Sequence, residues 1–110
     1  MLTSILHRAT GVALYGGALI LAGWVVALAS GQEAFAVYKG LLGSPLGKVV
    51  MFGLTVSLTY HLVNGIRHLA GDAGRGLEPR TADATGWFAI IFSLIAAIGV
   101  WVAAFFMGAL

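Results

Sequence analysis

Three long runs of this sequence contain no Asp, Glu, Lys or Arg residue, and they constrain the fold more than any other feature. The runs are residues 9–32, 49–66 and 84–110. A bilayer core is ~30 Å thick and needs roughly 20 helical residues at ~1.5 Å each. Each run, with its flanking residues, is long enough to cross a membrane. The predicted transmembrane helices are residues 4–29, 46–71 and 84–108.

The composition supports this interpretation. Of the 110 residues, 60% are hydrophobic and only 9% are charged, whereas a water-soluble domain carries far more charge on its surface. The chain has no cysteine, which excludes disulfides, thiolate nucleophiles and cysteine-bound clusters. No basic run is long enough to indicate nucleic-acid binding. We expect an all-α integral membrane bundle, in contact with lipid, that forms a single transmembrane domain over residues 1–110.

The few cations predict the orientation of the chain in the membrane. Arginines lie near the N-terminus and around the second connection, whereas only lysines flank the first connection. These residues are Arg8, Arg67, Arg75 and Arg80 against Lys39 and Lys48. Because cytoplasmic loops carry the excess of positive charge, the N-terminus is expected on the cytoplasmic or mitochondrial matrix side. With three spans, the C-terminus lies on the opposite side.

The two connections differ in composition. Glycines and Ser44-Pro45 mark breaks between the first two spans. Residues 32–42 between those breaks have the pattern of a short amphipathic helix at the membrane interface. Residues 73–83 predict a short charged loop, because their glycines and Pro79 disfavour continuation of the second helix.

The second predicted span carries polar residues that need an explanation in a membrane. At ~100° per residue, four of them share one face of the helix; they are Ser57, His61, Asn64 and His68. The first span is rich in glycine, which lets helices approach closely. Since a bundle of three spans has little interior of its own, we expect a partner subunit to complete it.

A neutral imidazole between apolar helices is a good ligand for haem iron. His61 is expected ~10 Å deeper in the membrane than His68, so one can bind iron while the other meets a propionate. His7 and Arg8 are expected at the depth of His68, too shallow for His7 to oppose His61. A second axial ligand would then come from another chain. The alternative is a histidine that only hydrogen-bonds a neighbouring helix.

Two segments carry a family resemblance. The sequence S-I-L-H-R-A-T-G-V runs from Ser4 to Val12, and Y-H-L-V-N-G-I-R-H-L-A-G-D runs from Tyr60 to Asp72. Together they resemble the cytochrome b membrane-anchor subunit of succinate dehydrogenase, and the three-span plan covers essentially the whole chain. One departure is that family members usually carry a further polar segment before the first motif, which here begins almost at Met1.

The resemblance implies a set of roles. His61 would be an axial ligand of one haem b, and a second, smaller anchor subunit would supply the other axial histidine. His7 and His68 would lie near the haem propionates, while Ser4 and Arg8 would line the ubiquinone site. The other implied partners are the iron–sulfur and flavoprotein subunits, where succinate is oxidised. The implied location is a bacterial inner membrane or the mitochondrial inner membrane.

Three alternatives remain open on the residues alone. One is a haem-free structural or assembly subunit of another respiratory complex, in which the polar face only bonds a partner helix. Another is the anchor of a fumarate reductase, with electrons running the other way. A proton- or ion-conducting subunit is disfavoured, because the third span offers no acid or base for a relay.

Overall fold

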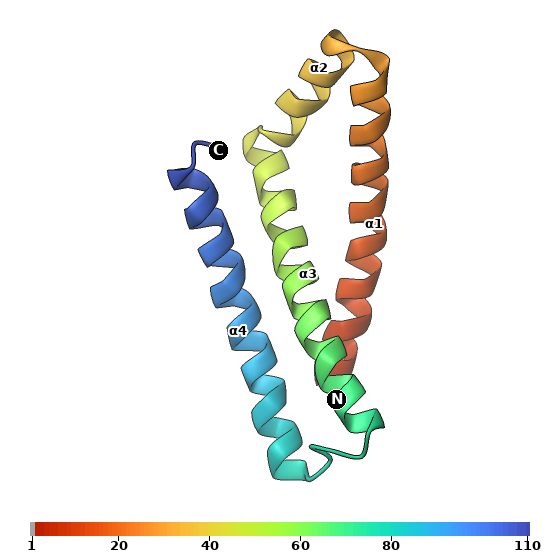
Figure 1. Cartoon of the computed structure of the whole chain (residues 1–110), viewed down its shortest axis with the longest axis vertical. Coiled ribbons are helices and arrows are strands. Elements are labelled where there is room, and N and C mark those ends of the chain that lie inside the picture. The colour runs from red at the N-terminus through yellow and green to blue at the C-terminus, as the bar shows by residue number, and fades with distance from the viewer. Residues whose placement is uncertain (1) are drawn as a thin grey trace.

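The computed structural model describes residues 2–110, and all the regular elements among them are helices. They are α1 (Leu2–Ser30), α2 (Gln32–Leu42), α3 (Pro45–Asp72) and α4 (Pro79–Phe106). The three long helices are each apolar enough to cross a membrane, which confirms the predicted all-α fold. They run along a molecule 55 Å in its longest dimension, with α3 between α1 and α4 (Figure 1).

The second connection is shorter than the sequence predicts. The third long helix was expected from about residue 84, but α4 begins at Pro79, with Glu78 as its extended N-cap residue. Proline suits the first helical position, because an N–H there has no partner within the helix and φ is already set near the helical value. The connection is therefore residues 73–78, and it turns through Gly74 and Gly76 at positive φ.

The short helix expected over residues 32–42 is present as α2. Gly31, at φ 117°, separates it from α1. The hydroxyl of Tyr38 donates a hydrogen bond to the backbone carbonyl of Ile20 on α1. Close contact of α2 with α1 depends on Gly23, since a Cβ there would lie 2.7 Å from the Tyr38 hydroxyl oxygen.

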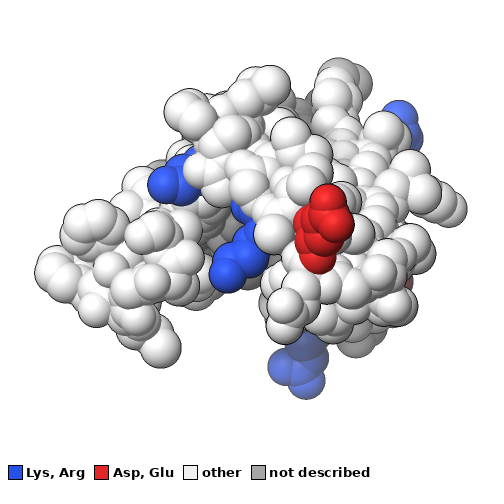
Figure 2. Space-filling view, turned by 90° about the horizontal axis from the view of Figure 1, so that it is seen from above, with Lys and Arg blue, Asp and Glu red and all other residues white. Residues whose placement is uncertain are grey.

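The buried face of α4 is made of small residues. Ala89, Ser93 and Ala97 follow one another at every fourth position of α4 and are at most 1% exposed. Their size lets α3 and α4 approach closely. In the end view of Figure 2 most residues are uncharged, with several basic and acidic side chains among them. Most large apolar side chains face outward instead of filling the interior. Such a surface suits lipid or partner helices.

The two ends of the bundle differ in what they carry. The N-terminus and the α3–α4 connection lie at one end, while α2 and the C-terminus lie at the other (Figure 1). This is the relative arrangement that the three predicted spans require. The end that holds the N-terminus also holds the polar side chains shared by α1, α3 and α4.

Candidate functional site

Two histidines from different helices lie against each other near the N-terminal end of α1. The rings of His7 on α1 and His61 on α3 are stacked, with centroids 3.9 Å apart and planes inclined by 13°. This separation is ordinary van der Waals contact. The two imidazoles therefore form one unit at the α1–α3 interface.

The stack corrects the predicted depth of His7. The sequence placed His7 level with His68, but it lies level with His61. The expectation assumed that α1 and α3 end at the same height. Past the stack, α3 continues from His61 to Asp72, about 16 Å at ~1.5 Å per residue, whereas α1 has only about 8 Å left to Leu2.

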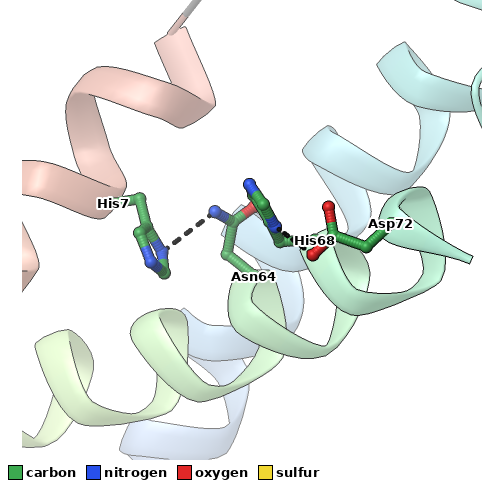
Figure 3. Close-up of polar contacts among 4 residues, drawn as sticks. All are labelled: His7, Asn64, His68 and Asp72. Carbon is green, nitrogen blue, oxygen red and sulfur yellow. Dashed lines mark hydrogen bonds and ion pairs between the residues drawn. The ribbon is translucent and has the colours of Figure 1, made fainter.

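Each imidazole of the stack has a hydrogen-bond partner at Nδ1. His61 Nδ1 lies 3.1 Å from Thr10 Oγ1, which also donates to the carbonyl of His7 at 3.0 Å. His7 Nδ1 lies 3.1 Å from the side-chain amide nitrogen of Asn64. Figure 3 shows Asn64 reaching from α3 toward His7 on α1. These bonds orient both rings.

Arg67 connects the histidine pair to α4. Its guanidinium donates to Asn64 Oδ1 at 3.2 Å, to Thr85 Oγ1 at 2.9 Å and to the carbonyl of Ala82 at 2.8 Å. All three acceptors are uncharged, so Arg67 adds a positive charge to this end of the bundle. Gly86 lets α4 approach α1 here, since a Cβ at Gly86 would lie 2.9 Å from Cγ2 of Thr3, whereas the guanidinium would stay at an ordinary contact distance of 3.5 Å.

His68 lies apart from the stack. Its Nδ1 is 3.3 Å from a carboxylate oxygen of Asp72 one turn later on α3, and both side chains are well exposed (Figure 3). Of the four polar residues predicted to share a face of this helix, His61 and Asn64 meet α1, while His68 points to the surroundings near the helix end. The two quinone candidates, Ser4 and Arg8, are also exposed, on α1 beside His7.

A groove opens beside His61. It has a volume of about 270 Å³ and is lined by Gly11, Leu14, Tyr15, Ala18 and His61. Gly11 lets the His61 ring lie close against α1, because a Cβ at this position would be only 3.3 Å from Cε1 of His61. An imidazole edge in an otherwise apolar and small-residue wall is the environment that a haem would need. The residues present therefore fit a haem on the His61 side of α1.

The same geometry excludes His7 and His61 as the two axial ligands of one iron. Axial nitrogens lie ~2 Å from the metal on opposite faces of the porphyrin, and the stacked rings of His7 and His61 leave no room for a porphyrin between them. No three His, Cys, Asp or Glu side chains within residues 2–110 could hold a metal ion together. A six-coordinate haem at His61 would need a ligand from another subunit.

Two residues of this site were not recognised in the sequence. Thr10 and Arg67 both lie inside the motifs that carry the family resemblance, but the sequence gives Arg67 a role only in the orientation of the chain. A polar residue one turn after His7, and a cation within the polar end of the second span, were the available signals. Neither signal reveals which side chain each residue would bond.

Comparison with known proteins identifies the family of this chain. Residues 1–100 match the family described as succinate dehydrogenase/fumarate reductase transmembrane subunit. The succinate dehydrogenase cytochrome b556 subunit of Paracoccus denitrificans is 38% identical over 97 residues, which cover 88% of this chain and 75% of that protein. The b556 subunit of Rickettsia prowazekii is 35% identical over 99 residues, covering 90% and 77%.

A mitochondrial protein is similar as well. The succinate dehydrogenase cytochrome b560 subunit of Sus scrofa is 34% identical over 102 residues, covering 91% of this chain and 60% of that protein. The likeness thus extends over nearly all of the three-helix bundle and includes the helices that carry the stacked histidines. This chain belongs to the family of succinate dehydrogenase cytochrome b membrane subunits.

Proposed function

We propose that this subunit binds one haem b through His61 and passes electrons from succinate to a quinone, in the respiratory chain and the tricarboxylic acid cycle. The observation that carries the proposal is His61 itself. Its ring lines an apolar groove, and its Nδ1 bonds Thr10, so Nε2 is left for a metal. A bound haem would supply one-electron chemistry between the iron–sulfur subunit and the quinone.

The stack supports a shared haem. Because His7 faces His61 ring to ring, the second axial histidine would come from a smaller anchor subunit that packs against α1 and α3. The outward-facing apolar side chains of the bundle support such a partner. His7 and His68 remain the candidates for contact with the propionates, and His68 is the nearer of the two to the end of α3.

Ser4 and Arg8 are the proposed quinone residues. A hydroxyl can hydrogen-bond a quinone oxygen, and a fixed cation stabilises the negative charge that develops during reduction. Both side chains are exposed on the first turns of α1, where partner subunits could complete a site. Ubiquinone is the proposed substrate, and the iron–sulfur subunit with its flavoprotein would dock at this end.

The proposal includes a membrane location and an orientation. The proposal places the chain in a bacterial inner membrane or the mitochondrial inner membrane, as one domain, with its N-terminus on the cytoplasmic or matrix side. The excess of arginine at the end that holds the N-terminus and the α3–α4 connection supports this orientation.

The test is haem content in the assembled complex. His61→Ala should lose haem or leave it five-coordinate, because one of two anchoring imidazoles is removed. Arg75→Gln is the control, since that side chain is exposed in the α3–α4 connection and lies outside the stack. A reduced-minus-oxidised b-type band equal to wild type in His61→Ala would refute the assignment. Absence of the b-type band from the wild-type complex would favour a haem-free assembly subunit.

A further inference from the structure

The hydrogen bonds at the stack assign a proton to His61. Thr10 Oγ1 donates its only hydrogen to the carbonyl of His7, at 3.0 Å. Toward His61 Nδ1, at 3.1 Å, the same oxygen can only accept. Nδ1 of His61 must therefore carry the hydrogen of this bond. A neutral imidazole has one N–H, so the lone pair of His61 is on Nε2.

The bonds of His7 lead to the opposite result. A guanidinium has donors only, so the atom of Asn64 that faces Arg67, at 3.2 Å, is the amide oxygen. The amide nitrogen then donates to His7 Nδ1 at 3.1 Å. The lone pair of His7 is on Nδ1, and its N–H is on Nε2. Two stacked imidazoles are held in opposite tautomers by two different helices.

We propose that Thr10 is a positioning residue that selects His61, rather than the adjacent His7, as the metal ligand and raises the basicity of its Nε2. The inference rests on the proposed haem ligation by His61. An acceptor at the distal N–H of a ligating histidine fixes its tautomer and ring orientation and makes it a stronger donor. A stronger donor favours ferric over ferrous iron, so Thr10 lowers the haem midpoint potential.

Asn64 and Arg67 complete the selection. With its Nδ1 occupied by the amide of Asn64 and its Nε2 protonated, His7 offers no free lone pair to a metal. It offers an N–H instead, which suits hydrogen bonding to an anionic oxygen. The ligand and its stacked neighbour thus differ in the partner that each ring nitrogen meets, although they are chemically identical residues.

The experiment compares Thr10→Val, Thr10→Ser and Thr59→Val in the complex assembled with its partner subunits. Valine keeps the shape of threonine without its hydroxyl, and serine restores the hydroxyl. Thr59 is the matched control, because it lies two residues from His61 and its hydroxyl bonds backbone carbonyls of α3 and α4, at Thr55 and Ser93, rather than an imidazole. The readouts are haem per complex, midpoint potential by redox titration, and the electron paramagnetic resonance spectrum of the oxidised haem.

Thr10→Val should raise the midpoint potential and change the g values while haem content stays at the wild-type level. Thr10→Ser and Thr59→Val should match wild type in potential. If Thr10→Val loses its haem, Thr10→Ser decides: retained haem with a wild-type potential supports the inference, and the same loss overturns it.

An unchanged potential in Thr10→Val, or an equal shift in Thr59→Val, would overturn the role of Thr10 and leave haem binding by His61 intact. Full six-coordinate haem in His61→Ala would refute the proposed function itself.

Discussion

Asn64 connects His7 to Arg67 through the two ends of one buried amide. Its nitrogen lies 3.1 Å from His7 Nδ1, and its oxygen lies 3.2 Å from the Arg67 guanidinium. The side chain is only 4% exposed, so water cannot readily replace either partner. The amide therefore links the imidazole of α1 to the cation that also bonds α4.

Replacing Asn64 with leucine should destabilise the assembled subunit. The substitution keeps an apolar volume but leaves Arg67 without one acceptor and His7 without its donor. A buried group that loses its partner costs about 1–3 kcal/mol. Thermal unfolding of the purified complex measures the effect, with the exposed Arg75→Gln as control. Equal loss of stability in both variants would contradict the inferred importance of the buried amide.

Replacing His7 with phenylalanine should leave a six-coordinate haem. Phenylalanine preserves a ring stacked on His61 but has no nitrogen, so the variant tests whether His7 is the opposite axial ligand. The parallel arrangement at 3.9 Å indicates that it is not. The absorption spectrum distinguishes six- from five-coordinate haem. A five-coordinate spectrum in His7→Phe, with His61 unchanged, would show that the stack rearranges when haem binds.

Much of the fold could be predicted because the membrane imposes it. Uncharged runs of sufficient length must be helical, since no water is available to satisfy backbone groups in lipid. The predicted start of α4 was wrong because of Pro79. From the sequence, this proline is expected to prevent α3 from continuing, whereas it is the first residue of α4. The same ring that breaks a helix interior is favoured at its first position. The sequence around Pro79 allows both interpretations.

The site could be predicted only in part, because the sequence of one helix does not determine how that helix is rotated and shifted against its neighbours. His61 was identified from its own position in an apolar run. The contacts of Arg67 with Asn64, Thr85 and Ala82 depend on how α3 and α4 are rotated and shifted against each other. One residue of slip rotates a contact by ~100°. The height of His7 depended in the same way on how far α1 extends past α3.

Alanine at Gly23 should weaken the packing of α2 against α1. A Cβ there would lie 2.7 Å from the Tyr38 hydroxyl and 3.1 Å from its ring, so the helices must separate or the tyrosine must move. Overpacking of this kind costs about 1–3 kcal/mol. Thermal stability of Gly23→Ala should fall and should recover in part when Tyr38→Phe is added.

Gly16→Ala is the matched control for that series, because, apart from its chain neighbours and the nearby backbone of its own helix, no atom of residues 2–110 lies within 4 Å of a Cβ at Gly16. Its thermal stability within the complex should stay near wild type. If Gly16→Ala proved as harmful as Gly23→Ala, the loss would reflect packing against a partner subunit rather than the contact with Tyr38.

The proposed orientation predicts which engineered cysteines a membrane-impermeant maleimide reaches. The chain has no cysteine of its own, so Ala73→Cys in the α3–α4 connection and Ala109→Cys near the C-terminus each create a single reactive site. In right-side-out vesicles from a bacterial host, Ala109→Cys should be labelled and Ala73→Cys should not. Inside-out vesicles should reverse the result. The opposite pattern would reverse the orientation inferred from the arginines.

Arg8 and Ser4 should separate quinone chemistry from haem binding. Removing one electrostatic stabiliser of developing negative charge typically costs about 10² to 10³ in rate. Arg8→Leu should therefore depress quinone reduction by the complex to that extent, while succinate oxidation with an artificial acceptor continues. Ser4→Ala should act in the same direction, but more weakly if water replaces the hydroxyl. The measurement is the ratio of the two activities at matched haem content.

Arg75→Gln is the control for this ratio, because it removes a positive charge from the α3–α4 connection without touching α1. A charge that acts only through the general field of this end of the bundle would give similar losses in Arg8→Leu and Arg75→Gln, and salt would screen both. A charge in contact with the quinone would give a loss confined to Arg8→Leu and insensitive to salt. An unchanged ratio in both the Arg8 and the Ser4 variants would move the quinone site away from α1.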